Sequence, residues 1–157
     1  MPGQLSTELI AAAQSAFAAW NVPASVTLAQ YALESGWGQH MPPESNNPFG
    51  IKAGPGQPSV TVPTREVING VSETVEAAFR AYPDLAAAFN DHGRLIASNP
   101  VYQTAMNVWC ATHDITKFVP ALAQHYATDP NYAKLILEII ADNEMTQYDT
   151  TAGGAAV

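Results

Sequence analysis

The sequence is poor in charged residues and almost free of cysteine. Charged residues make up 13% of the 157 positions, and 14 acidic against 6 basic residues leave a net charge of −8. Nucleic acids and anionic membranes repel a surface of this sign, so neither is expected as a partner. Cys110 is the only cysteine, which excludes an internal disulfide.

Long hydrophobic runs are also missing. No stretch has the length and apolar character of a membrane span. The N-terminal residues 1–4 show no basic patch followed by an apolar run, the pattern that begins a secretory signal. If the substrate is extracytoplasmic, we expect export by another route, or by a leader since removed.

Patterns typical of metal sites are absent as well. The four histidines are scattered without a spacing such as His-Glu-x-x-His, so neither a metal nor a cofactor is expected. A cysteine-peptidase function based on Cys110 is also disfavoured. This residue follows Val108 and Trp109 at an apolar helix end, and we predict a small buried side chain.

What the sequence does contain is enough apolar material for one packed core. Hydrophobic residues make up 47% of the chain, and we expect a single domain over residues 1–149 with a flexible tail at 150–157. Helical periodicity predicts helices over residues 6–19, 23–34, 84–97, 100–110, 114–127 and 130–143. Within these, Pro120 is expected to kink or shorten its helix, and Asp129 to cap the helix that begins at Pro130.

Between the two helical parts the composition changes. Pro, Gly, Asn and Ser are frequent from residue 37 to 63, which indicates irregular loop. Asn69-Gly70 then stands between two runs of β-favouring residues and predicts a β-hairpin over about residues 59–80. The expected fold class is therefore α+β, a mainly helical domain with a small β-hairpin lobe.

Glu34 is the most informative residue for function. It ends a predicted helix that is apolar nearly all round, and such a helix is buried. Burial and the negative end of the helix dipole both disfavour a carboxylate anion there. A glutamic acid that stays protonated near neutral pH can donate a proton to a glycosidic oxygen. An exposed glutamate without a role is the alternative.

Several segments resemble one enzyme family. The stretch AQYALESGWG at residues 29–38 is followed by NNPFGIK at 46–52, FRAY at 79–82, the segment 89–95, and YATDP at 126–130. In this order, and over residues 5–140, they resemble the glucosaminidases of glycoside hydrolase family 73, which include flagellar and autolytic wall hydrolases. The resemblance implies a lysozyme-like fold, hydrolysis of the β-1,4 bond that follows N-acetylglucosamine in peptidoglycan, and Glu34 as the general acid.

The resemblance also implies two further catalytic groups. Glu66, just before the Asn69-Gly70 turn, matches a second carboxylate that activates water or stabilises the transition state. Glu73 and Glu76 compete for this role, and an edge-strand residue paired with a neighbouring arginine is the structural alternative for Glu66. Tyr126 matches a tyrosine that orients the substrate's N-acetyl group or the attacking water; otherwise it is a core residue.

Five more residues are candidates for substrate binding. Asn47, Phe49 and Gly50 are expected mainly to fold the loop that forms the floor of the cleft. Trp37 either stacks on a sugar or belongs to the core, which we favour slightly. Tyr82 either lines the groove or packs the β-lobe against the helices.

The expected partner is thus a glycan strand of peptidoglycan, bound by a monomer. Two kinds of alternative stay open: a muramidase or lytic transglycosylase on the same polymer, and a non-catalytic wall-binding module. A lytic role in the bacterial periplasm or cell wall is expected, as a phage lysin or as a toxin injected into neighbouring bacteria, with export by a non-classical route such as a secretion apparatus or a phage holin. A toxin would need a cognate inhibitor, or immunity protein, in the producing cell.

Overall fold

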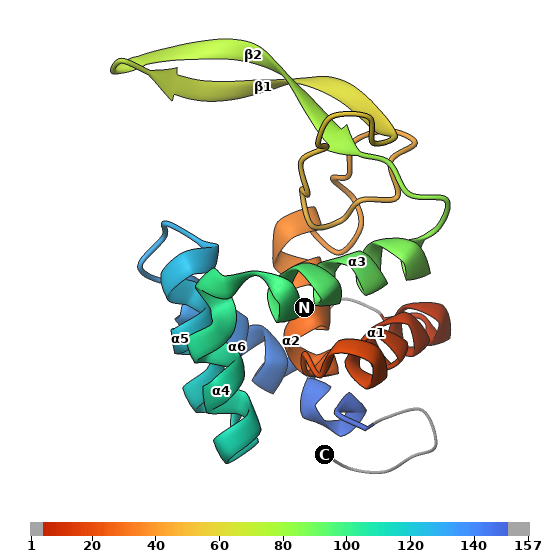
Figure 1. The fold of residues 1–157 in the computed structure, drawn as a ribbon, viewed down its shortest axis with the longest axis vertical. Coiled ribbons are helices and arrows are strands. Elements are labelled where there is room, and N and C mark those ends of the chain that lie inside the picture. Colours follow the sequence, from red (N-terminus) through yellow and green to blue (C-terminus); the bar gives the residue numbers. More distant parts are fainter. Residues whose placement is uncertain (1–4, 151–157) are drawn as a thin grey trace.

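The computed structural model describes residues 5–150, and within them it confirms the α+β fold class (Figure 1). Helices form a compact body, and one two-stranded antiparallel sheet projects from it. In chain order the elements are α1 (Thr7–Trp20), α2 (Ala24–Ser35), β1 (Ser59–Ile68), β2 (Val71–Arg80), α3 (Leu85–Ser98), the 3₁₀ helix η1 (Pro100–Tyr102), α4 (Gln103–Thr112), α5 (Ile115–Tyr126), α6 (Tyr132–Asp142) and the 3₁₀ helix η2 (Met145–Tyr148).

Helix α2 is the centre of the helical body. Every residue from Ala24 to Ala32 is buried, because α1, α6 and η2 all pack against this helix. Around it lie the largest fully buried side chains of the described chain, among them Phe17, Phe89, Trp109 and Phe118. Since α2 is enclosed along its length, its ends are where its polar groups can meet other polar groups or solvent.

The N-terminus of α2 is capped by a residue from the far end of the chain. Pro23 precedes the helix and provides no side-chain cap. Instead, Asp149 accepts hydrogen bonds from the Ser25 backbone N–H and from the Ser25 hydroxyl, both at 2.7 Å. A carboxylate at this position satisfies a free helical N–H group and complements the positive end of the helix dipole.

The hairpin forms over the predicted residues and around the predicted Asn69-Gly70 turn. Ser59 pairs with Arg80 at its base and Ile68 with Val71 at its tip. Asn69 and Gly70 have φ angles of 52° and 80°, the pair of positive values that a two-residue type I′ turn requires. Figure 1 shows the hairpin leaving the helical body and arching over toward the side where α5 and α6 are joined.

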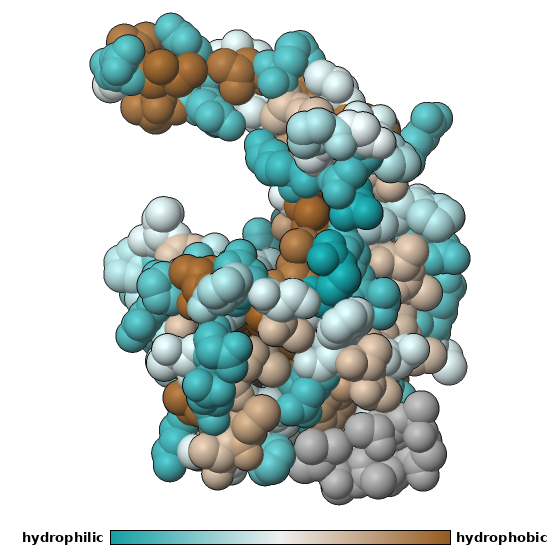
Figure 2. Space-filling view, in the orientation of Figure 1, coloured by the Kyte–Doolittle hydropathy of each residue, from teal (hydrophilic) through white to brown (hydrophobic). Residues whose placement is uncertain are grey.

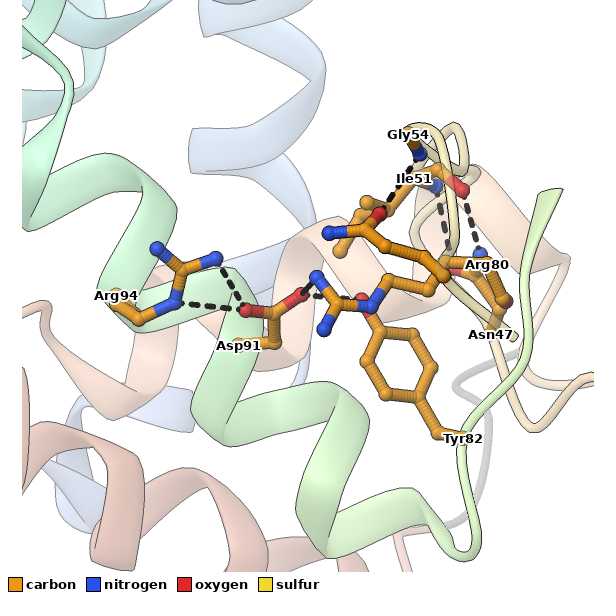
Figure 3. A network of polar contacts seen from close by, with 8 residues as sticks. Asn47, Ile51, Gly54, Arg80, Tyr82, Asp91 and Arg94 are labelled. Carbon is orange, nitrogen blue, oxygen red and sulfur yellow. Dashed lines mark hydrogen bonds and ion pairs between the residues drawn. The ribbon is translucent and has the colours of Figure 1, made fainter. Parts of the chain in front are cut away.

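The base of the hairpin is fastened to α3 by a buried carboxylate (Figure 3). Asp91 accepts hydrogen bonds from Tyr82 Oη at 2.5 Å and from Arg80 Nη1 at 3.1 Å, and it pairs with Arg94 at 2.7 Å. Opposite charges and hydrogen bonds hold the pKa of Asp91 below its ordinary value in spite of burial. This network fixes the direction in which the hairpin leaves the body.

Two predictions about helix ends need correction. Asp129 does not cap α6 directly: its Oδ1 accepts from the Asn131 N–H at 2.8 Å, which closes a turn, and the helix begins at Tyr132. Of the two effects expected of Pro120, a kink or a shortening, the shortening does not occur, because α5 continues to Tyr126. Proline has no backbone N–H, so the Thr116 carbonyl four residues earlier receives no helical hydrogen bond from Pro120. Both residues are exposed, and water can donate to that carbonyl instead.

Cys110 was predicted to be buried and is exposed instead. The buried face of α4 consists of Ala105, Met106 and Trp109, and the next residue is rotated away from that face by about 100°. Of the tail expected at 150–157, Thr150 is described and its hydroxyl accepts a hydrogen bond from Gln14 Nε2 at 3.1 Å, whereas residues 151–157 lie outside the described part of the chain. Across residues 5–150, none of the helices combines the length and apolar character needed to cross a bilayer.

The Asp149 cap gives a prediction for stability. Replacing Asp149 with Ala removes both bonds to Ser25, and we expect the free energy of unfolding to fall by about 1–2 kcal/mol, the usual effect of a lost N-cap. Urea unfolding followed by circular dichroism measures it. Asp149→Asn, which keeps an accepting oxygen, should lose clearly less; an equal loss in both variants would contradict the capping role.

Candidate active site

Glu34 lies in the last turn of α2, at the end of the buried helix. Gly36 follows as the C-cap with a φ of 56°, and Gly38 has a φ of 85°. A Cβ atom on Gly38 would stand 2.4 Å from Tyr31 Oη, so no larger residue fits there without movement. The two glycines therefore let the chain turn sharply at the end of the helix and leave Glu34 at its rim.

Two hollows meet at Glu34. The first, which we call the lobe-side hollow, lies between the loop after α2 and the base of the hairpin, and it is lined by Glu34, His40, Met41, Pro42, Pro43, Asn47, Pro48, Gly50, Val62, Thr64 and Phe79. The second, the helix-side hollow, lies toward the α5–α6 connection and is lined by Leu33, Glu34, Tyr126, Ala127, Thr128, Asp129, Tyr132 and Leu135. Figure 2 shows the open space between the arching hairpin and the helical body. Glu34 is shared by both linings, so a polymer lying along the cleft would pass over it.

The Glu34 carboxyl group is accessible to solvent on its cleft side and crowded by protein on the other. Desolvation by these neighbours raises its pKa above the ordinary value, and a hydrogen bond that Tyr132 Oη donates to Oε1 at 3.1 Å partly offsets the rise. Because the residue as a whole is exposed, we regard the desolvation as partial. The result is a carboxyl group that holds its proton more firmly than a surface glutamate does.

Tyr126 lines the helix-side hollow as one member of an aromatic column. Its ring stacks on Tyr132 with centroids 5.7 Å apart and meets the edge of His92 at 6.2 Å. His92 in turn stacks on Phe49 at 4.1 Å. Burial lowers the pKa of His92 to about 3, so this imidazole is neutral, and burial also keeps the pKa of Tyr126 well above 10. The column presents a neutral phenol to the cleft beside Glu34.

The hairpin register separates the three candidate carboxylates on the lobe. Directly paired residues share a face, and residues two apart along a strand return to it. Glu66 pairs with Glu73, and this pair lies on the same face as Val62 and Thr64, which line the lobe-side hollow. Glu76 pairs with Pro63, on the opposite face. Glu66 and Glu73 thus belong to the cleft-facing side, farther out toward the tip.

The neighbouring arginines do not hold Glu66. Arg65 donates hydrogen bonds to Thr74 and Ser72 on the outer face, and Arg80 is bound to Asp91. Over the described residues, no ion pair of Glu66 is formed, and its side chain is exposed. The structural alternative weighed for this residue, pairing with a nearby arginine, is therefore not realised here.

The loop residues act mainly as scaffold. Asn47 is buried; its amide group donates to the carbonyls of Ile51 and Arg80, both at 2.9 Å, and its Oδ1 accepts from the N–H of Ile51 at 3.2 Å (Figure 3). This ties the loop after α2 to the base of the hairpin. Phe49 is buried under the loop, while Gly50, with a φ of 67°, lines the lobe-side hollow.

Besides the buried Phe49, two more of the expected binding residues line neither hollow. Tyr82 is buried with its hydroxyl on Asp91, so it joins the lobe to α3 and lines neither hollow. Trp37 is half-buried, packs against the core, and also lines neither. The favoured core placement of Trp37 agrees with this position.

Sequence reasoning missed Tyr132, the residue that touches Glu34. The signal was available: Tyr132, Ile136 and Ile140 are spaced by four and form the buried stripe of α6. An aromatic residue at the start of such a stripe is expected to be a core residue. Nothing in the neighbouring sequence indicates that its hydroxyl contacts a carboxyl group 98 residues away.

A helical body with a hairpin lobe, and a cleft whose acid ends a buried helix, define the lysozyme-like class of glycan-cleaving domains. The glucosaminidase family model, described as mannosyl-glycoprotein endo-beta-N-acetylglucosaminidase, matches residues 10–145, and the chain belongs to this family.

Individual relatives agree with this membership. The chain is 36% identical over 140 residues to the peptidoglycan hydrolase FlgJ of Vibrio cholerae, covering 84% of this chain and 41% of the relative. It is 32% identical over 147 residues to the exo-glucosaminidase LytG of Bacillus subtilis, covering 87% and 50%. The crystal structure of the catalytic domain of the autolysin Auto from Listeria monocytogenes superposes with a TM-score of 0.80 at 27% identity, covering 94% of this chain and 90% of that one. The chain thus spans half or less of the two curated relatives' length.

The Tyr132 bond gives a prediction for pH dependence. Its donated hydrogen bond stabilises the ionised form of Glu34, so Tyr132→Phe should raise the pKa of Glu34 further. If Glu34 must be protonated to act, the alkaline limb of kcat/KM then moves to higher pH, while the maximal rate falls because the carboxyl group loses a positioning contact. A pH–rate profile on soluble wall fragments measures both; an alkaline limb that stays in place or moves to lower pH would contradict the assignment.

Proposed function

We propose that the protein is a peptidoglycan hydrolase, an endo-β-N-acetylglucosaminidase that cleaves the β-1,4 bond between N-acetylglucosamine and N-acetylmuramic acid. The observation that carries the proposal is Glu34, with its raised pKa, at the junction of the two hollows. A glycan that fills both hollows brings a glycosidic oxygen close to this carboxyl group. Family membership and relatives named peptidoglycan hydrolases support the polymer.

In this mechanism Glu34 is the general acid. It gives its proton to the glycosidic oxygen as the bond to the anomeric carbon breaks, and positive charge develops on the sugar ring. The cleft around it combines apolar side chains such as Val62 and Phe79 with few charges, so a bound glycan would displace water from the solvent-accessible side of the carboxyl group.

Glu66 is the second carboxylate in this proposal. Support comes from its place on the cleft-facing side of the hairpin, next but one to Thr64. There it can stabilise the developing charge or activate water once the lobe moves toward the bound glycan. Tyr126 contributes a neutral hydroxyl that orients the substrate's N-acetyl group or the water. If the N-acetyl group itself attacks, Glu34 and Tyr126 suffice and Glu66 is auxiliary.

The setting we propose is lytic action in the periplasm or cell wall, as a phage lysin or an injected toxin. The charge of −8 disfavours general adhesion to an anionic wall, so recognition depends on the shape and hydrogen bonds of the cleft. In the toxin case, an inhibitor would have to fill that same cleft. Expression of the chain with and without a periplasmic leader tests this role, since only the exported form should lyse the host.

The central test is Glu34→Gln. Loss of the transferable proton should reduce wall hydrolysis by about 10²–10⁴-fold, with the urea unfolding midpoint unchanged because Gln still accepts from Tyr132. Release of soluble fragments from purified walls measures the activity. A normally folded Glu34→Gln protein with wild-type turnover would refute the proposal. Mass spectrometry of the products identifies the bond: reducing N-acetylglucosamine ends support it, whereas reducing muramic acid or anhydro ends indicate a muramidase or a transglycosylase.

The hairpin carboxylates offer a matched comparison. Glu66→Gln should lower kcat by at least about tenfold, while Glu76→Gln, on the opposite face of the same strand pair, should stay near the wild-type value. Both variants should unfold at the same urea concentration, because both side chains are exposed. Equal kcat values for the two variants would remove Glu66 from the mechanism.

A further inference from the structure

Gln30 is a fully buried polar residue in the most enclosed helix of the protein. Its side-chain Nε2 donates to Tyr132 Oη at 3.1 Å. Its Oε1 has no hydrogen-bond partner within the described chain. A buried acceptor without a partner destabilises a fold, and an apolar side chain at this position would avoid that cost. The position of Gln30 therefore calls for a reason other than packing.

Gln30, Tyr132 and Glu34 form a continuous chain of hydrogen bonds. Tyr132 Oη accepts from Gln30 and donates to Glu34 Oε1, and both bonds measure 3.1 Å. A tyrosine hydroxyl has a single hydrogen, so it can serve only one acceptor at a time. In the arrangement of the structure, Tyr132 gives its hydrogen to Glu34, which is the arrangement that an ionised Glu34 requires.

A protonated Glu34 requires the opposite arrangement. Its own O–H can donate to Tyr132 Oη, and the Tyr132 hydrogen then needs another acceptor. Gln30 Oε1 becomes that acceptor if the amide rotates by half a turn, because the oxygen and the NH₂ group of a glutamine have nearly the same size and exchange places. The unpartnered oxygen is thus the group that the second state uses.

We propose that Gln30 is a positioning residue whose amide turns over as Glu34 gains or loses its proton, so that Tyr132 holds the carboxyl group in place in both states. This deepens the proposed function and rests on Glu34 as the general acid. No proton is transferred between Gln30, Tyr132 and Glu34. The Glu34 proton goes to the glycosidic oxygen and is replaced from water. The Tyr132 hydrogen stays on its oxygen and changes acceptor by rotation about the C–O bond.

The other titratable groups around Glu34 do not take part in the change of acceptor at the Tyr132 hydroxyl. Tyr126 from α5, Asp129 from the α5–α6 connection and His40 from the loop after α2 line the same hollows. Within residues 5–150, none of their side chains hydrogen-bonds the Tyr132 hydroxyl, although the Asp129 backbone carbonyl accepts from the Tyr132 N–H at 3.1 Å. Tyr102 lies beside Tyr126 and directs its hydroxyl to the His125 carbonyl at 3.4 Å. The pKa values of all three tyrosines are raised by burial, so their hydroxyls stay neutral.

The first experiment uses the unmodified protein. In an NMR titration of the full chain, the Glu34 carboxyl carbon reports its own ionisation, and the Gln30 side-chain NH₂ resonances report the amide. We expect the Gln30 signals to shift with the same midpoint as Glu34. If they do not move through that transition, the amide does not respond to the acid and the proposal is overturned. The NMR shifts of Gln30 do not depend on catalysis. The proposed function is tested separately, because an active Glu34→Gln protein would refute it.

The second experiment tests the effect on turnover. Gln30→Met has similar length but no amide, and we expect kcat to fall several-fold with KM unchanged, while the urea midpoint stays equal or rises because the unpartnered oxygen is gone. In a protein that already carries Tyr132→Phe, Gln30→Met should lower kcat little further, because the hydrogen bonds that connect Gln30 to Glu34 are already lost. Tyr102→Phe is the control and should keep the wild-type kcat. Wild-type kcat for Gln30→Met, or fully additive losses with Tyr132→Phe, would overturn the proposal.

Discussion

The structure depends on the complete enclosure of one helix. Because α2 is buried from Ala24 to Ala32, it makes polar contacts through only a few groups, chiefly at its two ends. At its start, Asp149 provides the cap that the local sequence lacks, and at its finish Gly36 and Gly38 turn the chain away so that Glu34 remains at the rim. A carboxyl group carried by such a rigid support keeps its position relative to the cleft, as the acid catalysis proposed for Glu34 demands.

The hairpin is supported in a different way. Its base is fixed by Asp91 and by Asn47, two buried polar residues that connect it to α3 and to the loop after α2. Its outer half has no such support, and Val67, Ile68 and Val71 are exposed at the tip. A two-stranded ribbon without a packing partner is only marginally stable by itself. One side of the cleft therefore carries Glu34 on a well-packed helix, and the other side is a hairpin whose outer half has few packing contacts.

Much of this could be predicted from the sequence, because the signals are local. Asn69-Gly70 determines the hairpin turn and hence the register. Apolar periodicity gives the ends of each α-helix to within three residues, and the largest difference is the start of α4, predicted at residue 100 and found at Gln103 after the 3₁₀ helix η1. Glu34 was predicted as the acid from its place at the end of an apolar helix together with the resemblance of residues 29–38 to the family motif. The errors were local as well: one position around the helix separates the buried Trp109 from the exposed Cys110, and the turn formed by Asp129 resembles a cap.

What the sequence did not reveal are contacts between residues far apart in the chain. Tyr132 meets Glu34 across 98 residues, Gln30 meets Tyr132 across 102, and Asp149 meets Ser25 across 124. Each partner has an ordinary local role that explains it equally well, as core aromatic, buried amide or surface acid. Periodicity shows which face of a helix is buried, but the identity of the neighbour on that face depends on the packing of the whole domain.

These long separations also govern the order of assembly during synthesis. The α2 helix can form early, yet its N-terminal cap and the partner of its acid both emerge from the ribosome more than 90 residues later. Non-local contacts of this kind form late, because the intervening chain must first be ordered. A nascent or truncated chain that ends before α6 thus carries Glu34 without the tyrosine that positions it, and completion of the site coincides with completion of the fold.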